Sequence, residues 1–285
     1  MENYQTSFTT TRFFDLDSQR HVNSATYLSY VRQGQFDFLH NLGYDTPYFT
    51  RHGIYLKPEL IHVQYLRQLA AHVPLEVRSN AWRMSNSIYW DQQIVNRDSG
   101  ELSAHLTTLM SVDENLLDKI SLCDEEFPEP LLTWDIRQNF TNTCKRSEMD
   151  YRVRHIDLDG FNQCSDIVLW RLNEEARWRL LEDVGVSFGE LLRNDLSLFW
   201  INGIYCYYGE VGLNDPLKVY TWISRVDKVR IYIRQEIFKD SGKGFGDRIL
   251  RTEGEFLAVA LSRSKPIRVP EILRAAFEPY MENTQ

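Results

Sequence analysis

Arg12-Phe-Phe-Asp15-Leu-Asp17 and Arg154-His-Ile-Asp157-Leu-Asp159 are two copies of one signature, placed 142 residues apart in the chain. The same offset relates further pairs over roughly ninety positions: Gly43 and Gly185, Tyr65 and Tyr207, Pro74 and Pro216, Gln93 and Gln235, Asp98-Ser-Gly100 and Asp240-Ser-Gly242. A match of this length indicates an internal duplication, which constrains the architecture before any local pattern is considered. We therefore expect two copies of one fold.

Each copy begins with a strand pattern and continues as a helix. Residues 7–14 and 149–156 alternate in polarity and predict strands that lead into the Asp-x-Asp turn. One helix face then follows in each copy: Tyr27, Tyr30, Val31, Gly34 and Phe38, matched by Leu169, Leu172, Asn173, Ala176 and Leu180. Gly43 and Gly185 come next, where helices commonly end. The small residues Gly34 and Ala176 share one slot, which predicts close packing there.

Strand patterns fill the rest of each copy. Aromatic and β-branched residues dominate segments 61–65, 102–112 and 231–237, and the two Asp-Ser-Gly sequences are typical of hairpin turns. A helix that packs on antiparallel strands is an α+β design. We predict an α+β fold with one long helix and an antiparallel sheet in each copy.

The length of 285 residues suits two domains. Composition changes around the acidic, proline-bearing segment Asp124-Glu-Glu-Phe-Pro-Glu-Pro130. We place a first unit at 1–123, a linker at 124–147 and a second unit at 148–285.

Composition argues against several classes of function. The chain carries 32 basic and 40 acidic residues, a net charge of −8, which disfavours nonspecific nucleic-acid binding. We expect no membrane association, because no segment reaches the roughly 18 consecutive apolar residues of a membrane span. Residues 1–11 lack a basic cluster and an apolar stretch, so we expect no signal peptide and a cytoplasmic protein.

Metal and nucleotide cofactors are not expected either. The four cysteines, at 123, 144, 164 and 206, show no paired ligand spacing, and reduced thiols are the expected state. Glycine-rich phosphate loops and closely spaced histidine pairs are absent from the sequence. We expect no metal and no cofactor.

The stretch Asp15-Leu-Asp17-Ser-Gln-Arg-His21-Val-Asn-Ser24-Ala-Thr-Tyr27-Leu resembles the DxDxxGHVNNxxYL signature of hotdog-fold thioesterases, of both the 4-hydroxybenzoyl-CoA and the acyl-ACP type. Arg20 replaces the Gly and Ser24 the second Asn. The second copy keeps Asp157 and Asp159 but has Gln163 and Ser165 in place of His21 and Asn23. It carries Glu174 and Arg177, which fit the family's Glu-x-x-Arg, where the first copy has Arg32 and Gln35.

This resemblance implies that each copy is a hotdog unit, a long helix wrapped by an antiparallel sheet, and that the tandem forms an internal pseudo-dimer. It implies a monomer of that kind or a further homo-oligomer. The implied substrate is an acyl thioester of CoA or of acyl carrier protein. Plant-type acyl-ACP enzymes have an Asn where Gln19 stands and carry the motif in the second half of the chain, so their mechanism does not transfer directly.

The chemistry of thioester hydrolysis needs a base or nucleophile and donors for an oxyanion. Asp17 is able to activate water or to attack directly, and the sequence leaves both open. Backbone N–H groups at the start of the helix, near His21 to Ser24, would face a bound carbonyl. Asn23 or Ser24 is a natural N-cap. For Asp15 a direct role and a structural role stay open, and His21 is a base, a donor or a structural contact.

The sequence therefore predicts a candidate site centred on the first copy. The catalytic candidates are Asp17, His21, Asn23 and Asp159. The substrate-binding candidates are Gln19, Val22, Ser24, Tyr27, Tyr65 and Glu174. Weaker candidates on predicted strands are Glu59, His62, Asn202 and Glu210.

Acidic carrier proteins prefer basic surfaces, and two sets of residues could supply one: Arg225, Lys228, Arg230 and Arg234, or the segment 263–268. A charged, solvated strand face is the simpler interpretation of these residues. The alternatives in function are a hotdog hydratase or dehydratase, and a noncatalytic protein that binds acyl thioesters. The Asp-x-x-x-x-His pattern that we associate with hydratases is absent, because Asp17 and His21 are one residue too close.

Overall fold

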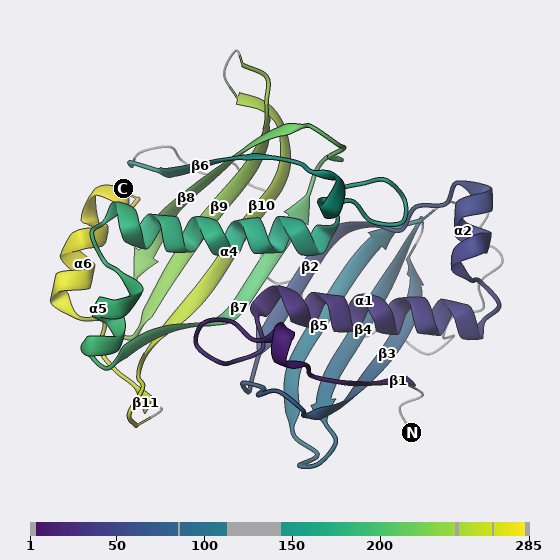
Figure 1. The fold of residues 1–285 in the computed structure, drawn as a ribbon, viewed down its shortest axis with the longest axis horizontal. Helices are drawn as coiled ribbons and strands as arrows, with labels where there is room; N and C mark the ends of the chain where they lie inside the picture. Colours follow the sequence, from purple (N-terminus) through teal and green to yellow (C-terminus); the bar gives the residue numbers. More distant parts are fainter. Residues whose placement is uncertain (1–3, 85, 113–143, 243–244, 264, 283–285) are drawn as a thin grey trace. The chain divides into compact units, whose positions relative to one another are not determined.

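The computed structural model describes residues 4–84, 86–112, 144–242, 245–263 and 265–282. The chain divides into two compact units, Met1–Trp134 and Asp135–Gln285 (Figure 1). Most of the linker predicted at 124–147, together with Cys123, lies outside the described residues. The first described strand of the second unit begins at Ser147.

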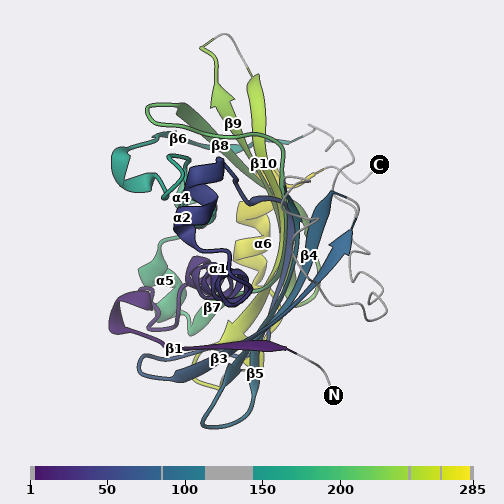
Figure 2. The same cartoon turned by 90° about the vertical axis from the view of Figure 1, so that its right-hand side faces the viewer.

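The described part of the first unit consists of two α-helices, a 3-10 turn and a five-stranded antiparallel sheet. Its elements are β1 (Gln5–Thr10), the 3-10 turn η1 (Phe13–Asp15), α1 (Ser24–Asn41), α2 (Thr46–His52), β2 (Lys57–Tyr65), β3 (Pro74–Met84), β4 (Ser87–Asn96) and β5 (Leu102–Ser111). The strand order is β1-β3-β4-β5-β2, with all neighbours antiparallel. The α1 helix crosses one face of this sheet (Figures 1 and 2).

The second unit repeats this plan and adds a C-terminal segment. Its elements are β6 (Ser147–Arg152), η2 (His155–Asp157), α4 (Asp166–Asp183), α5 (Phe188–Arg193), β7 (Leu196–Tyr207), β8 (Pro216–Val226), β9 (Arg230–Asp240), β10 (Phe245–Ala260), β11 (Lys265–Pro266), α6 (Glu271–Phe277) and η3 (Glu278–Tyr280). The order is β6-β8-β9-β10-β7, and β11 pairs with β10. The predicted α+β class and the duplication are both confirmed.

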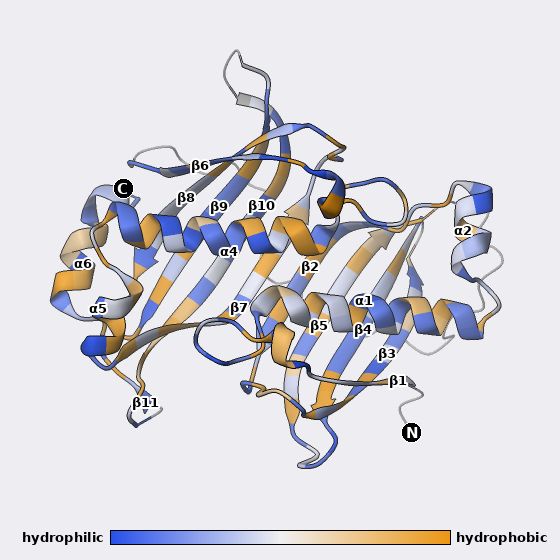
Figure 3. Cartoon of the chain, in the orientation of Figure 1, coloured by the Kyte–Doolittle hydropathy of each residue, from blue (hydrophilic) through white to orange (hydrophobic). Residues whose placement is uncertain are grey.

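The two long helices bury the faces that their periodicity predicts. All five predicted positions are buried in α1 and all five in α4. Hydrophobic and hydrophilic residues alternate along both helices (Figure 3). Gly43 and Gly185 adopt φ angles of 92° and 76° just past the helix ends, as expected for residues that stop a helix. A Cβ on Gly34 would lie 2.9 Å from Val77 Cγ1 and 3.0 Å from Ser79 Oγ, so the helix packs closely on β3 as predicted.

A buried glutamine joins helix and sheet in each unit. Gln92 Nε2 donates to the carbonyl of Val31 and to Ser79 Oγ, both at 2.9 Å. Gln235 Nε2 donates to the carbonyl of Asn173 at 2.8 Å and to Thr221 Oγ1 at 2.9 Å. The predicted match of Gln93 with Gln235 is therefore wrong by one residue. An irregularity in the β8–β9 pairing at Ile223 and Arg225 accounts for the shift.

Candidate active site

The first acid of each Asp-x-Asp holds the turn in front of the long helix. Asp15 is 4% exposed, and its Oδ2 accepts from the backbone N–H of Arg12 and from Tyr30 Oη, both at 2.7 Å. Arg12 Nη2 also donates to Oδ1 at 2.8 Å. Burial acts to raise the pKa of Asp15, but the hydrogen bonds from Arg12 and Tyr30 outweigh it and hold the pKa below its usual value. These contacts give Asp15 a structural role.

Asp157 repeats this arrangement with a different phenol. Its Oδ2 accepts from the backbone N–H of Arg154 and from Tyr151 Oη, both at 2.7 Å. Tyr30 lies on α1, whereas Tyr151 lies on β6. A tyrosine on a helix in the first unit and a tyrosine on a strand in the second unit therefore donate to equivalent buried carboxylates.

The second acid, Asp17, organises the loop that carries His21. Its Oδ1 accepts from the backbone N–H groups of Gln19 at 2.8 Å and His21 at 3.2 Å. The Asp17 N–H donates to the carbonyl of His21 at 2.8 Å, and Arg20 adopts a φ of 65° to close the loop. Within the described residues no hydrogen bond reaches Asp17 Oδ2, which leaves one carboxylate oxygen for chemistry.

Asp159 forms the same loop in the second unit. Its Oδ1 accepts from the N–H groups of Phe161 at 2.8 Å and Gln163 at 3.2 Å, and Asn162 adopts a φ of 61°. Here too, the described part of the chain offers no hydrogen bond to Oδ2. The two acids therefore have matching backbone surroundings, and the difference between the loops lies in the neighbouring side chains.

His21 and Tyr27 distinguish the first loop. His21 is half-buried, and this burial lowers the pKa of its imidazole, although the negative charge of Asp17 opposes the shift. Tyr27 is 3% exposed; burial raises the pKa of its phenol, and Asp17 raises it further. Both rings are thus within electrostatic reach of Asp17, and both are neutral at neutral pH. The second unit has Gln163 and Leu169 at these positions.

Tyr65 connects this cluster to the start of α1. Its hydroxyl donates to the carbonyl of Ser24 at 2.9 Å, and its ring meets Tyr27 edge-on with centroids 5.0 Å apart. Asn23 is the N-cap of α1, and its Oδ1 accepts from the N–H of Ala25 at 2.9 Å. Val22 is 5% exposed and donates its N–H to the carbonyl of Leu69 at 2.9 Å. The structure therefore brings the first-unit candidates together at one helix N-terminus.

The candidates of the second unit have other surroundings. Tyr207, the equivalent of Tyr65, accepts a 2.8 Å hydrogen bond from Trp170 Nε1, and Trp170 stacks on Tyr205. Glu174 is half-buried on α4. Burial, only partly offset by Arg177, raises the pKa of Tyr205 to about 12, and the charge of Glu174 contributes to this rise. Arg177 is buried, donates to Gln235 Oε1 at 3.1 Å and lies 4.2 Å from the Trp200 ring centroid.

The weaker candidates lie away from the α1 N-terminus or are held by other groups. His62 is buried on β2, and Glu59 contacts Ser111 across the β2–β5 pair. Arg225, Arg230 and Arg234 are ion-paired with Asp227, Glu255 and Glu253, so the first predicted basic surface is largely neutralised. Arg263, Lys265 and Arg268 are exposed.

The described ranges contain neither a metal-binding cluster nor a helix that could span a membrane. No cluster of three or more His, Cys, Asp or Glu is placed to hold a metal ion. No helix among these residues has the length and hydropathy needed to cross a membrane. Cys144, Cys164 and Cys206 form no disulfide among the described residues, and burial raises the pKa of Cys164 to about 12.

Sequence reasoning missed the tyrosines that bind the first acid. The sequence predicts only that Tyr30 lies on the packing face of the helix and that Tyr151 lies on a strand. It also missed the loop carbonyls of Leu69 and Val211, which accept from the N–H groups of Val22 and Cys164. The repeat offers one signal: Leu172 stands where the first copy has Tyr30, and Tyr151 where it has Thr9.

Comparison with solved structures supports the tandem hotdog fold. A putative oleoyl thioesterase from Lactobacillus plantarum matches with a TM-score of 0.70 at 12% identity, over 90% of this chain and 97% of that chain. The 12:0-ACP thioesterase from Umbellularia californica also matches with a TM-score of 0.70 at 12% identity, over 90% and 94%. At this identity the likeness shows the fold alone.

Comparison of sequences shows the family. A chloroplastic acyl-acyl carrier protein thioesterase, ATL3, from Arabidopsis thaliana is 26% identical over 135 residues, which are 47% of this chain and 68% of the relative. The model of the thioesterase-like superfamily matches residues 11–131 and again residues 153–277, one match in each unit. Because these two matches cover most of the sequence, the chain belongs to the thioesterase-like superfamily.

Proposed function

We propose that this protein hydrolyses acyl thioesters, carried by CoA or by an acyl carrier protein, to a free acid and a thiol. Membership of the thioesterase-like superfamily supports the reaction class, and the Arabidopsis relative is named for acyl-acyl carrier protein substrates. The observation that carries the proposal is the Asp17 loop. One carboxylate oxygen is fixed by two backbone N–H groups, while the other is free of hydrogen bonds within the described residues, and the charge of Asp17 acts on the imidazole of His21.

In the proposed reaction Asp17 Oδ2 acts either as a general base on water or as a nucleophile on the acyl carbon. As a general base it takes a proton from water, and the hydroxide adds to the carbonyl; as a nucleophile it forms a mixed anhydride that water then hydrolyses. In both routes the carbonyl oxygen gains negative charge, which the N–H groups and the dipole at the α1 N-terminus stabilise. The C–S bond breaks as this charge collapses, which in the nucleophilic route is the step that forms the anhydride. The leaving thiolate takes up a proton that comes from the attacking water.

The remaining candidates hold this arrangement or contact the substrate. Asn23 caps α1 and so positions the oxyanion donors. Gln19, Val22, Ser24, Tyr27 and Tyr65 are proposed to surround the acyl thioester. In the second unit Asp159 and Glu174 are proposed to support a weaker site, because Gln163 replaces the histidine. We propose a cytoplasmic protein that acts as a monomer or as a further homo-oligomer.

The test compares two equivalent acids. Wild type, Asp17→Asn and Asp159→Asn are incubated with acyl-CoA and acyl-carrier thioesters of several chain lengths, and released thiol is measured. We expect Asp17→Asn to lower kcat at least about a hundredfold, by analogy with the loss of a positioned acid or base, and Asp159→Asn to retain most activity. The second variant is a matched control, because both acids hold the same loop geometry.

Two outcomes would contradict the proposal. Full activity in Asp17→Asn would remove this acid from the mechanism. Binding of thioesters without thiol release, at every chain length, would favour a noncatalytic acyl-thioester protein. Addition of water to an enoyl thioester without cleavage of the thioester would favour a hydratase.

A further inference from the structure

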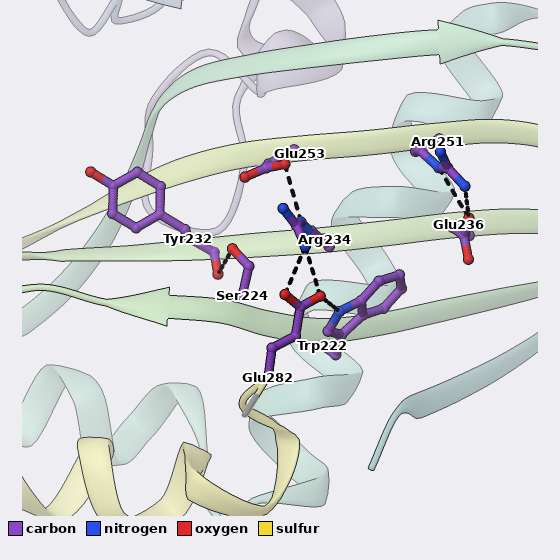
Figure 4. A network of polar contacts seen from close by, with 8 residues as sticks. All are labelled: Trp222, Ser224, Tyr232, Arg234, Glu236, Arg251, Glu253 and Glu282. Carbon is purple, nitrogen blue, oxygen red and sulfur yellow. Dashed lines mark hydrogen bonds and ion pairs between the residues drawn. The ribbon is translucent and has the colours of Figure 1, made fainter. Parts of the chain in front are cut away.

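The second unit carries a buried charged network on the sheet face turned away from α4, which we call the outer face. Gln235 and Thr252 bond to Asn173 of α4 and so point to the helix side. Because side chains alternate along a strand, their neighbours Arg234, Glu236 and Arg251 point to the other side (Figure 4). None of these residues takes part in the chemistry proposed above.

Three arginines of this network converge on one carboxylate. Arg251 donates to Glu236 Oε1 from Nε at 3.1 Å and from Nη2 at 2.8 Å. Arg248 Nε lies 3.0 Å from the same oxygen, and Arg146 Nη1 lies 3.5 Å from Oε2. Glu236 lies on β9 and Arg248 and Arg251 lie on the neighbouring β10, whereas Arg146 immediately precedes β6, which β8 separates from β9. We call Arg146, Arg248 and Arg251 the arginine cluster.

The arginine cluster holds more positive charge than Glu236 neutralises. Arginine stays charged in proteins, so three cations face one anion. The adjacent set, Arg234 with Glu253 and Glu282, adds one cation and two carboxylates, and the whole network still has four cations to three anions. The Arg251, Glu236 and Arg146 side chains are only 1%, 4% and 10% exposed, so water screens this excess poorly.

The cluster also has one buried N–H group, Nε of Arg146, without an acceptor among the described residues, and one side that is open to solvent. Arg248 is 30% exposed, and its Cζ lies 5.4 Å from the ring centroid of Tyr208, which is 41% exposed. A ligand entering from solvent would therefore meet Arg248 and Tyr208 before the buried arginines.

The fold does not require the arginine cluster, because the first unit has other residue types at the equivalent positions. There Tyr4 replaces Arg146 and Gln93 replaces Glu236, and Gln93 Nε2 donates to Tyr4 Oη at 3.1 Å. His105 pairs in register with Gln93 as Arg251 pairs with Glu236. The same sheet face is therefore built without an arginine cluster in one unit and with it in the other.

We propose that the arginine cluster is a binding site for a phosphate monoester. A dianionic phosphate offsets the excess positive charge, accepts charge-assisted bonds from guanidinium groups and fits their planar donor geometry. The Tyr208 ring provides a flat apolar surface beside it. Two sources share this chemistry: inorganic phosphate and the 3′-phosphate of CoA. The site lies on the opposite side of the second sheet from α4, and it does not depend on the proposed hydrolysis.

Thermal unfolding of the full chain tests this proposal. The melting temperature is measured with inorganic phosphate, CoA, dephospho-CoA and sodium chloride, all at equal ionic strength. A ligand that binds the folded state raises Tm with its concentration. We expect Tm to rise either with inorganic phosphate only, or with inorganic phosphate and also with CoA when each is added separately. We expect no rise in Tm with dephospho-CoA, which lacks the 3′-phosphate monoester. The first result identifies inorganic phosphate as the source, and the second identifies CoA.

Three variants separate binding from a purely structural role. Arg248→Gln is expected to weaken phosphate affinity about tenfold, the loss of one charge-assisted contact. Glu236→Gln removes the competing carboxylate, so Tm falls without ligand but phosphate binds more tightly and restores it. Arg179→Gln, an exposed arginine on α4, is the control and leaves binding unchanged. Equal Tm in phosphate and chloride, or unaltered phosphate binding in Arg248→Gln, would overturn the proposal.

Discussion

Tyr30 Oη donates a 2.7 Å hydrogen bond to Oδ2 of Asp15, and the carboxylate that receives it is 4% exposed. The equivalent bond in the second unit, also 2.7 Å, comes from Tyr151, on a strand instead of a helix. A buried carboxylate without enough donors is costly, so each unit supplies a phenol by a different route. The first acid of the motif is thus a fixed anchor for the loop that presents the second acid.

Removal of the phenol should therefore destabilise the first unit. We expect Tyr30→Phe to lower the free energy of unfolding by about 2 kcal/mol, the typical contribution of a hydrogen bond to a charged group. Urea denaturation followed by circular dichroism measures the change. Tyr151→Phe is the matched variant and should show a similar loss. Tyr48→Phe on α2 is the control, with an expected change below about 0.5 kcal/mol. Equal stability of wild type and Tyr30→Phe would show that Arg12 alone suffices for Asp15.

The pKa of His21 gives a test of the loop that is independent of activity. Burial lowers this pKa below the ordinary value of 6.5, whereas the charge of Asp17 acts to raise it. The ring is therefore neutral at pH 7 and gains a proton only in more acidic solution. We expect Asp17→Asn to lower the pKa of His21 further, since it removes the opposing charge. Titration by NMR of the imidazole measures both values.

The control for this titration is Asp45→Asn, which changes a carboxylate at the N-cap of α2 in the same unit. It should leave the His21 titration as in wild type. A rise in the pKa of His21 on Asp17→Asn would mean that the two side chains do not interact as the structure places them.

The sequence was sufficient for the duplication, the helix faces and the cluster at the α1 N-terminus, because these follow from local periodicity and from a motif within one loop. It was insufficient where a contact joins distant segments. The Gln93 assignment failed because an irregularity in the β8–β9 pairing shifts the register without any visible change in pattern. The pairing of Arg234 with Glu253 and Glu282 depends on cross-strand register and on the path of the C-terminal segment, neither of which a single sequence displays.

The corrected register can be tested by mutating adjacent glutamines. Gln92 is buried and bonds to Val31, Ser79 and Gln35, whereas the half-buried Gln93 bonds to Tyr4. We expect Gln92→Leu to lower the free energy of unfolding by about 2 kcal/mol, because it leaves buried polar groups without a hydrogen-bond partner. Gln93→Leu should lower it by less than about 1 kcal/mol. Gln235→Leu should cost more than Gln92→Leu, because it also removes an acceptor from the buried cation of Arg177. Chemical denaturation gives all three values. A larger loss of stability for Gln93→Leu than for Gln92→Leu would support the match of Gln93 with Gln235.

Gly34 is a sensitive point of contact between α1 and the sheet. Alanine favours helix by about 1 kcal/mol over glycine, so Gly34→Ala would stabilise an exposed helix. Here its Cβ would lie 2.9 Å from Val77 Cγ1 and 3.3 Å from Gln92 Nε2, and overpacking of a core costs about 1 to 3 kcal/mol. We expect a net loss of stability, measured as a fall in Tm. Gly189→Ala is the control on α5: its Cβ would first meet the flexible end of Arg193 at 3.4 Å, and Tm should stay or rise. An equal rise in both variants would show that β3 yields and that the close approach of α1 is not a constraint.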